Sequence, residues 1–315
     1  MIGTTVDQRI RKLRAPKPWV DPWRAHGSLV EEERRPDGTI ERALTVFLAG
    51  AECPYTCSFC DLWRWTIDGP TPAGALAWQL KEVLDATPPP IPDRVKLYNA
   101  SNFFDQRAVP VQDLPAIATL AGRFASVTVE SHARTVGPRT LELARMLSGN
   151  LEVAIGLETT HPVAMEHLNK RLSLTRFAQA AGFLADHAIA LRVFVLLNPP
   201  YVPAQETVQW TVRAVEYAVR CGAAVVAIIP VRSGNGEMER LQALGHFTPP
   251  TLSALEDALD RCLKFAPAVV AADLWDAQRL ATCPECSSTR IERLARLNLT
   301  GRAEPRIACS ACGGQ

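Results

Sequence analysis

The stretch Cys53-Pro-Tyr-Thr-Cys-Ser-Phe-Cys60 decides how this chain is interpreted, because it places three cysteines in a Cys-x3-Cys-x2-Cys pattern. It follows an apolar run, Leu44-Thr-Val-Phe-Leu-Ala-Gly50, which predicts a buried strand that leads into the cysteine loop. Iron–sulfur clusters are held by cysteine thiolates, and a cubane normally takes four of them. The pattern therefore predicts a [4Fe-4S] cluster with one iron that lacks a protein ligand, which fits three cysteines better than zinc or a disulfide does.

The spacing, the aromatic Phe59 before the last cysteine and the preceding strand resemble the signature of the radical SAM superfamily. This resemblance implies that S-adenosylmethionine (SAM) binds the open iron through its amino and carboxylate groups. It also implies an external electron donor of the flavodoxin or ferredoxin type. Reduction then cleaves SAM to a 5′-deoxyadenosyl radical, which abstracts hydrogen from a substrate. The chain is thus expected to be an enzyme, with lyase, rearrangement and group-transfer outcomes all open.

The composition is typical of a cytoplasmic enzyme. The 315 residues are 47% hydrophobic, which is enough for a large core, and no apolar run approaches the roughly 20 residues that span a membrane. The first residues, 1–14, contain arginines but no apolar segment of a signal peptide. Seven of the nine cysteines fall in two groups of the metal-binding type, and this favours a reducing compartment. No membrane partner is expected, since no long apolar run is present.

Apolar strand-like runs alternate with helical patterns along the chain. Strands are expected at 44–49, 94–98, 125–130, 151–156, 190–197 and 224–229, and helices at 73–86, 113–124, 138–147, 174–187, 205–221 and 251–265. Strands that are apolar throughout are typical of a parallel sheet with both faces buried. The fold class is therefore predicted as α/β, a partial (β/α)6 TIM-type barrel over residues 44–270.

Two appendages flank the predicted barrel. Residues 1–43 form an N-terminal extension with a β-hairpin around Pro36-Asp37-Gly38, whose second strand runs on into the barrel. Residues 271–315 form a tail with the pairs Cys283-Pro-Glu-Cys286 and Cys309-Ser-Ala-Cys312. Four thiolates at this spacing predict a zinc-ribbon-like, closed tetrahedral site, and a second iron–sulfur cluster is the alternative.

Polar residues follow five of the expected strands, at 98–105, 130–134, 156–161, 198–201 and 230–237. Parallel β/α barrels gather their chemistry at the C-terminal ends of the strands. These segments therefore predict one pocket around the cysteine loop. For His132 and His161 a structural hydrogen-bonding role fits the pattern as well as catalysis does, so the catalytic residues stay unassigned.

Four segments resemble the radical SAM subunit of archaeosine synthase and, more distantly, the radical domain of the Elongator catalytic subunit. They are Lys96-Leu-Tyr-Asn-Ala-Ser-Asn-Phe-Phe-Asp105, Val129-Glu-Ser131, Leu151-Glu-Val-Ala-Ile-Gly-Leu-Glu-Thr159 and Leu168-Asn-Lys170. The resemblance covers roughly residues 40–265 and implies action on a 7-deazaguanine-type nucleoside of tRNA. The chain has Asn99-Ala-Ser-Asn102 where the group has Thr-Ser-Gly-Ser, which leaves the substrate open.

The same resemblance implies which residues contact SAM. The contacts lie in the cysteine loop and after the later strands: Phe59, Asp61, Trp63, Ser101, Asn102, Glu130, Glu158 and Lys170. The backbone from Asp61 to Trp63 is expected beside the adenine, with Phe59 packed nearby. Ser101 and Asn102 are expected at the amino group of SAM.

Charged residues are implied at the other end of the ligand. Glu130 and Glu158 are expected to bind the ribose hydroxyls or the methionine moiety. Lys170 is expected to pair with the SAM carboxylate, and Arg171 competes for that role.

The net charge of +1 is uneven along the chain. Residues 1–24 carry six basic and two acidic side chains, and five arginines stand against three glutamates from Cys283 onward. Basic ends are able to steer a polyanion, and ordinary solvated surface is the alternative. Three functions follow: a radical SAM enzyme for a modified tRNA nucleoside, one for a small metabolite or peptide, or a non-enzymatic iron–sulfur or zinc module that binds nucleic acid.

Overall fold

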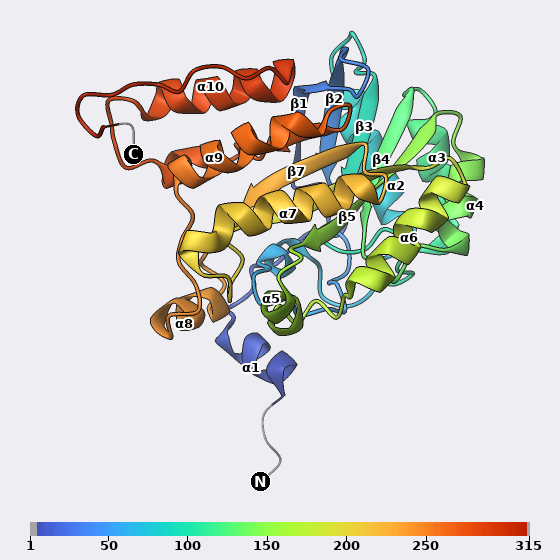
Figure 1. Ribbon diagram of the computed structural model, residues 1–315. Coiled ribbons are helices and arrows are strands. Elements are labelled where there is room, and N and C mark those ends of the chain that lie inside the picture. Colours follow the sequence, from blue (N-terminus) through green and yellow to red (C-terminus); the bar gives the residue numbers. More distant parts are fainter. Residues whose placement is uncertain (1–4, 314–315) are drawn as a thin grey trace.

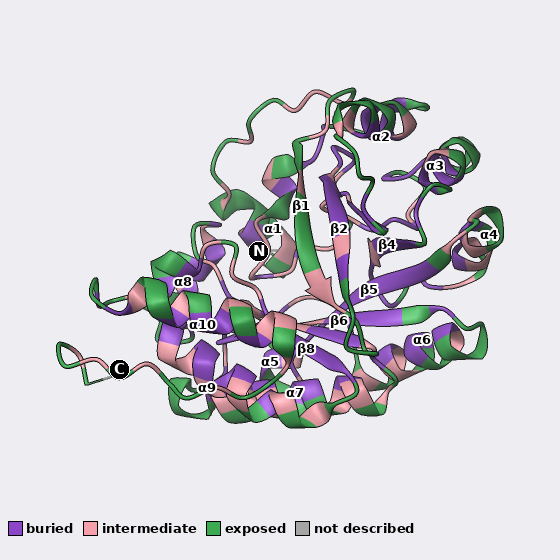
Figure 2. Ribbon diagram, turned by 90° about the horizontal axis from the view of Figure 1, so that it is seen from above, coloured by how far each residue is buried: buried purple, intermediate pink, exposed green. Residues whose placement is uncertain are grey.

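The computed structural model describes residues 5–313, in which one eight-stranded sheet curls into an open barrel (Figures 1 and 2). The strands follow the chain in the order β1 (Gly27–Arg34), β2 (Ile40–Phe47), β3 (Arg94–Tyr98), β4 (Ser126–Ser131), β5 (Asn150–Glu158), β6 (Ala190–Leu197), β7 (Val225–Pro230) and β8 (Val269–Ala272). The first pair is antiparallel and every later pair is parallel. The first four residues of the predicted extension and the last two of the tail lie outside the described range.

The helices are α1 (Val6–Leu13), α2 (Ala75–Ala86), α3 (Leu114–Ala121), α4 (Pro138–Met146), α5 (Pro162–His167), α6 (Leu174–Asp186), α7 (Thr207–Arg220), α8 (Glu237–Ala243), α9 (Leu252–Cys262) and α10 (Ser287–Thr300). The helices α2, α3, α4, α6, α7 and α9 cover the outer surface of the sheet, as the view from above shows (Figure 2), and α1, α5 and α8 lie at one end of it (Figure 1). Outward side chains such as Leu44 and Val46 pack with Leu76 and Leu80 of α2 in one large core. The predicted α/β partial barrel is therefore confirmed. No helix among residues 5–313 is both long and apolar enough to cross a bilayer.

The predicted hairpin is also confirmed. β1 and β2 pair from Arg34–Ile40 to Gly27–Phe47, and Asp37 accepts hydrogen bonds from the backbone and hydroxyl of Thr39 in the turn. Gly38 adopts a φ of 84°, which a residue with a Cβ rarely adopts. The predicted strand at 44–49 is thus the second half of a longer strand that begins in the hairpin.

The barrel has one more parallel strand than expected. β8 spans four residues, Val269–Ala272, too few for a recognisable period. The helices α1, α5, α8 and α10 were also missed, and the first three of them are no longer than eight residues. Such short helices depend on tertiary contacts for their stability, so the sequence carries little signal for them.

Ion pairs fill the barrel interior near the start of the strands. Arg94 Nε lies 2.6 Å from Glu41 Oε1, and Arg192 Nε lies 2.7 Å from Glu152 Oε1. Lys96 Nζ lies 2.7 Å from Glu33 Oε1. Each buried charge has an opposite charge beside it, because an unpaired ion in the interior is strongly destabilising. This charged layer lies at the opposite end of the strands from the cysteine loop, which follows β2.

The tail packs against the two edge strands of the sheet. α10 contacts both β1 and β8. On the β8 side, Asn298 accepts a hydrogen bond from the backbone N–H of Ala272 (2.8 Å) and donates one to its carbonyl (2.9 Å). On the β1 side, Gly301 lies against the side chain of Arg34 with no room for a Cβ. The tail thereby covers sheet edges that would otherwise expose unpaired backbone groups.

Candidate cluster and cofactor site

The cysteine loop after β2 is held in place by residues from distant parts of the chain. Asn235, after β7, donates hydrogen bonds to the carbonyls of Ser58 (2.8 Å) and Cys60 (3.2 Å). Asn169 donates to the carbonyl of Thr56 at 2.8 Å, and the backbone N–H of Ser58 donates to Leu168 at 2.9 Å. The loop therefore has a fixed shape at the C-terminal end of the barrel, where the sequence predicted the pocket.

The three thiols of this loop are partly buried, and the charge of each affects its neighbours. Burial raises the pKa of all three, and that of Cys57 reaches about 12, so these sulfurs become thiolates only beside a cation such as iron. The donor chemistry thus fits a [4Fe-4S] cluster.

Glu158 and Lys170 form a buried ion pair beside the cysteine loop. Glu158 ends β5 after a register shift that begins at Gly156, and its φ is 69°. Its carboxylate pairs with the ammonium group of Lys170, whose Nζ lies 6.0 Å from the ring centroid of Phe59. Burial opposes the charge of Lys170, but Glu158 and Cys57 raise its pKa above the usual value. The structure thus places a cation at the thiols, with its charge balanced by Glu158.

The loop after β3 is shaped by Glu130 of β4. The Glu130 carboxylate accepts the backbone N–H of Asn99 at 2.7 Å and those of the next two residues. Burial raises the pKa of Glu130 to about 7 against the effect of these donors. Both amide atoms of Asn99 and the hydroxyl of Ser101 are buried without a partner among the described residues. Unpartnered polar atoms mark this loop as a candidate ligand contact, and the sequence analysis did not single out Asn99 for that role.

Asn102, in contrast, has partners at both ends of its side chain. Its Oδ1 accepts the backbone N–H of His132 at 2.7 Å, and its Nδ2 donates to Cys53 Sγ at 3.3 Å. The amide is therefore directed at a cluster cysteine, whereas the sequence placed it at the amino group of SAM.

On either side of the last cysteine, Phe59 and Trp63 pack against other parts of the protein, whereas Leu62 and Trp65 are exposed. Phe59 contacts a small apolar cluster that includes Leu196 and Met238. Asp61 precedes a 3₁₀ turn, Leu62–Trp65, and the ring of Trp63 is buried with the Arg14 guanidinium 4.7 Å from its centroid. The Trp63 side chain thus packs with the N-terminal segment, and only its backbone is available at the predicted adenine position.

The helix α1 lies at the lower end of the molecule in Figure 1 and contacts the cysteine loop. Asp7 accepts hydrogen bonds from Asn169 Nδ2 (2.8 Å) and Thr56 Oγ1 (2.6 Å) and pairs with Arg171. These hydrogen bonds from Asn169 and Thr56, with the Arg171 charge, lower the pKa of Asp7 to about 2. Arg171, the second predicted partner of the SAM carboxylate, is therefore engaged by the N-terminal helix.

Both histidines of the predicted pocket make structural contacts. The ring of His132 stacks on Tyr55 with centroids 4.2 Å apart, and burial lowers its pKa to about 3, so it is neutral. His161 accepts the backbone N–H of Ala164 at 3.2 Å as the N-cap of α5. These are the structural roles that the sequence left open beside catalysis.

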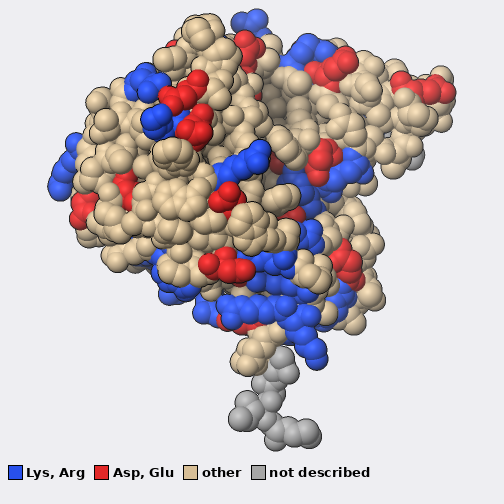
Figure 3. Space-filling view, turned by 180° about the vertical axis from the view of Figure 1, so that it is seen from behind, with Lys and Arg blue, Asp and Glu red and all other residues tan. Residues whose placement is uncertain are grey.

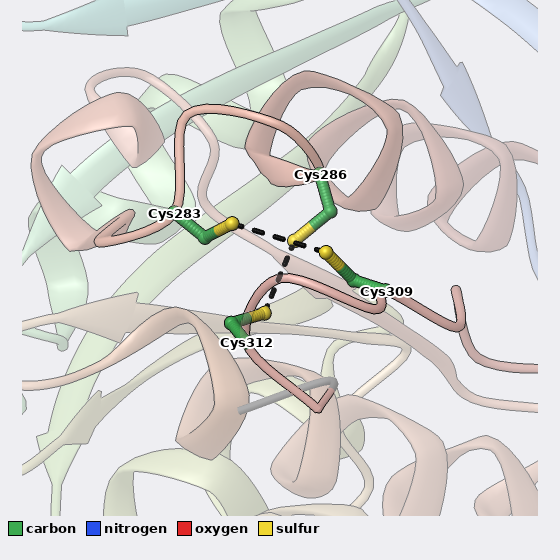
Figure 4. Close-up of side chains that lie close together, drawn as sticks. All are labelled: Cys283, Cys286, Cys309 and Cys312. Carbon is green, nitrogen blue, oxygen red and sulfur yellow. Dashed lines mark hydrogen bonds between the residues drawn. The ribbon is translucent and has the colours of Figure 1, made fainter.

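The four cysteines of the tail converge on one point (Figure 4). Their sulfurs all lie within 4.8 Å of one another, with Cys283–Cys309 at 3.9 Å and Cys286–Cys312 at 3.7 Å. Backbone N–H groups of Cys286 and Glu285 lower the pKa of Cys283 to about 7, which favours its thiolate. The predicted grouping of the four tail cysteines is confirmed, but a helix, α10, joins its two halves in place of ribbon strands.

The arginines of the tail bind acidic side chains of α9. Arg290 Nη2 lies 2.6 Å from Glu256 Oε2, and Arg293 Nη2 lies 2.7 Å from Asp260 Oδ1, both buried. Arg306 pairs with Asp257 and Asp260. The sequence offered nucleic-acid docking or solvation for these arginines, whereas these three hold the tail on the barrel. Residues so far apart in sequence gave no signal of this pairing.

No protein-family model and no curated protein matches the chain. Solved structures that resemble it include Elp3 from the archaeon Methanocaldococcus infernus (12% identity, TM-score 0.49, 62% of this chain and 50% of that one). Others are methylornithine synthase, PylB (12%, 0.47, 78% and 80%), and coproporphyrinogen III oxidase, HemN, from Escherichia coli, described as a radical SAM enzyme (9%, 0.43, 82% and 55%). The chain spans half the length of the Elp3 structure. At identities of 9–12% and TM-scores below 0.5, these are distant similarities of fold alone.

Proposed function

We propose that this chain is a radical SAM enzyme in which Cys53, Cys57 and Cys60 hold a [4Fe-4S] cluster with one open iron for SAM. The observation that carries the proposal is the position of the three-cysteine loop at the C-terminal end of a partial parallel barrel. The donor from Asn102 and the buried cation of Lys170 suit an electron-rich cluster at this position. When bound, a cluster of this kind supplies reductive cleavage of SAM and hydrogen abstraction from carbon.

The chain's own residues bind and orient the ligand. Asn99 and Ser101 offer buried, unpartnered polar atoms for the polar groups of SAM. Lys170 and Glu158 offer one charge of each sign to its carboxylate and ammonium groups. The backbone from Asp61 to Trp63 would lie beside the adenine. Glu130 shapes the loop that presents Asn99, so its role toward SAM is indirect.

The decisive experiment is anaerobic reconstitution with iron and sulfide, followed by reduction in the presence of SAM. We expect about four irons at the first site and formation of 5′-deoxyadenosine. The Cys57→Ala variant should lose both, because two thiolates do not hold the cubane. Normal 5′-deoxyadenosine formation by that variant would contradict the proposal. A wild type that binds iron without cleaving SAM would favour the non-enzymatic module.

For the substrate we propose a modified nucleoside within RNA, of the 7-deazaguanine type in tRNA. Support comes from exposed aromatic rings near the ends of β2 and β8, where Trp65 is 50% and Trp275 is 68% exposed. His26 links the two tryptophans. Its ring contacts the carbonyl of Trp65, and its backbone N–H donates a hydrogen bond to the carbonyl of Phe47. The centroid of the Phe47 ring lies 6.0 Å from that of Trp275. Unpaired bases stack on such rings.

Exposed cations of the N-terminal segment also support an RNA substrate. Arg11, Lys12 and Arg24 are exposed in the N-terminal segment, and Figure 3 shows Lys and Arg gathered at the end of the molecule that carries α1. RNA bound here should lose affinity steeply with salt, and Trp275→Ala should weaken binding about tenfold, within the range of one stacked base. A free metabolite or peptide is the alternative substrate. It would be favoured if the protein bound no RNA at any salt concentration. Comparison of nucleosides and metabolites between a deletion strain and its parent by mass spectrometry would identify the substrate.

For the tail we propose one structural Zn²⁺ bound by Cys283, Cys286, Cys309 and Cys312. Zinc–sulfur bonds of about 2.3 Å place the corners of a tetrahedron roughly 3.8 Å apart. The sulfur separations of 3.7 and 3.9 Å in the structure match this value, and a cubane would need wider ones. Four protein ligands close the site to substrate, which indicates a structural role. Because both sites need reduced thiols, we also propose a cytoplasmic location.

A further inference from the structure

Asn102 is the one residue of the β3 loop whose side chain joins a cluster cysteine to the strand β4. It is 3% exposed and makes two hydrogen bonds. Its Nδ2 donates to Cys53 Sγ at 3.3 Å, and its Oδ1 accepts the backbone N–H of His132 at 2.7 Å. Among the described residues, Cys53 Sγ accepts a side-chain hydrogen bond from Asn102. The backbone N–H of Tyr55 donates a second hydrogen bond to the same sulfur.

The orientation of this amide follows from its partners. A backbone N–H only donates, so the end of Asn102 that faces His132 must be the oxygen. The NH₂ end is therefore directed at the sulfur. His132 is itself immobilised, because its ring stacks on Tyr55 and its Nε2 lies 3.1 Å from the carbonyl of Lys170. A rotation of Asn102 away from Cys53 would leave a buried N–H without an acceptor, which is unfavourable.

We propose that Asn102 is a positioning residue that raises the reduction potential of the cluster through its hydrogen bond to Cys53. This inference rests on the proposed function, since it requires a cluster at the three cysteines. Reduction by one electron adds negative charge to the cluster and its thiolates. A hydrogen-bond donor at a thiolate stabilises the more negative state more strongly, and hydrogen bonds to the sulfurs are among the factors that set cluster potentials.

Lys170 does not replace this contribution. Its charge also lies near Cys53 and Cys57, but Glu158 pairs with it and offsets much of its field. Asn102 is neutral and has no such opposing partner. The geometry therefore makes Asn102 the side chain whose removal changes the charge balance at Cys53 without altering the net charge of the site.

The test is a potentiometric titration of the anaerobically reconstituted full-length protein without SAM, followed by electron paramagnetic resonance of the reduced cluster. At the wild-type midpoint potential, Asn102→Ala should show a threefold to tenfold lower ratio of reduced to oxidised cluster. A tenfold lower ratio corresponds to a midpoint potential about 59 mV more negative for a one-electron couple. Asn298→Ala is the matched control. Asn298 also uses both amide ends, but on Ala272, so its removal should leave the potential unchanged.

A second variant guards against loss of the loop structure. Asn102→Asp keeps an oxygen for the His132 N–H while it removes the donor to sulfur and adds a negative charge, so its potential should fall further than that of Asn102→Ala. Equal potentials in the wild type and Asn102→Asp, at full iron content, would overturn the proposal. If the wild type itself assembles no cubane, the proposed function fails instead, and the two failures are therefore distinguishable.

Discussion

The carboxylate of Glu158 and the ammonium group of Lys170 form an ion pair directly over Gly156. The side chains are 6% and 13% exposed, respectively, and the pair lies where β5 ends beside the cysteine loop. A Cβ at position 156 would overlap Glu158 Oε1 and lie 2.5 Å from Lys170 Nζ. The absence of a side chain at Gly156 therefore provides the space in which these two charges meet. Several expectations for this region of the molecule depend on that space.

Gly156→Ala should displace the ion pair and reduce SAM affinity at least tenfold. The added methyl group overlaps polar atoms that are held by β5 and by the 168–171 segment, so the pair must move. We expect iron content to stay near that of the wild type, because the cysteines are not contacted. Equilibrium SAM binding to the reconstituted protein measures the effect. Gly182→Ala, on α6 with open space around it, should bind SAM normally and gain up to about 1 kcal/mol of stability. Equal affinity of the two variants would contradict this prediction.

Removal of either Glu158 or Lys170 alone should lower the free energy of unfolding more than removal of both. Glu158→Ala and Lys170→Met each leave a buried charge without its partner, which costs about 3–5 kcal/mol in comparable sites. Each should also weaken SAM binding with iron content intact. The double variant should recover most of the free energy of unfolding but none of the SAM affinity. Denaturant titration and SAM binding on the same samples separate the two effects. Unchanged SAM affinity in Glu158→Ala would assign Glu158 to structure or to substrate contact.

Protonation of Glu33 in acid should lower the stability of the folded protein. Burial raises the pKa of this carboxyl group, but Arg192 and Lys96 lower it to about 2, below the ordinary value of 4.5. A depressed folded-state pKa stabilises the protein fully above the unfolded-state value, and the contribution is lost as pH falls from about 5 toward 2. The shift corresponds to at most about 3 kcal/mol.

The Glu33→Gln variant isolates that contribution. It should be less stable than the wild type at pH 7, and the difference should shrink between pH 5 and pH 3. Denaturant titrations at several pH values test this. A stability difference that is independent of pH would show that the ion pairs of Glu33 do not titrate as described.

Loss of Cys309 should release the tail metal. Three remaining thiolates leave the tetrahedral site open, so Cys309→Ser should lose one zinc per chain and retain the iron. Metal analysis by mass spectrometry tests this, with Cys221→Ser, a cysteine outside both groups, as the control. SAM cleavage without substrate should persist, since the tail lies on the barrel edge. Iron and sulfide beyond one cubane, without zinc, would instead identify a second cluster in the tail.

Local patterns accounted for much of the architecture. The alternation of apolar runs and helical patterns predicted six of the parallel strands and the six helices α2, α3, α4, α6, α7 and α9, because period and turn residues act over short distances. The hairpin at Pro36–Gly38 and the four cysteines of the tail were predicted from spacing for the same reason. The sequence did not predict β8, because four residues are too few to show a periodic pattern. α10 and its pairing with α9 escaped because their stability comes from contacts with distant residues.

The sequence by itself determined the chemistry available to this protein: three thiolates on one loop, four more in the tail, and polar residues at the ends of successive strands. Only the tertiary structure decided which of these groups meet. Glu158 with Lys170, Asn102 with Cys53, and Arg290 with Glu256 are pairs separated by 12 to 49 residues. A buried charge or amide must find a partner in three dimensions, and the partner is set by strand order and loop geometry. Spacing along the chain contains no record of that choice.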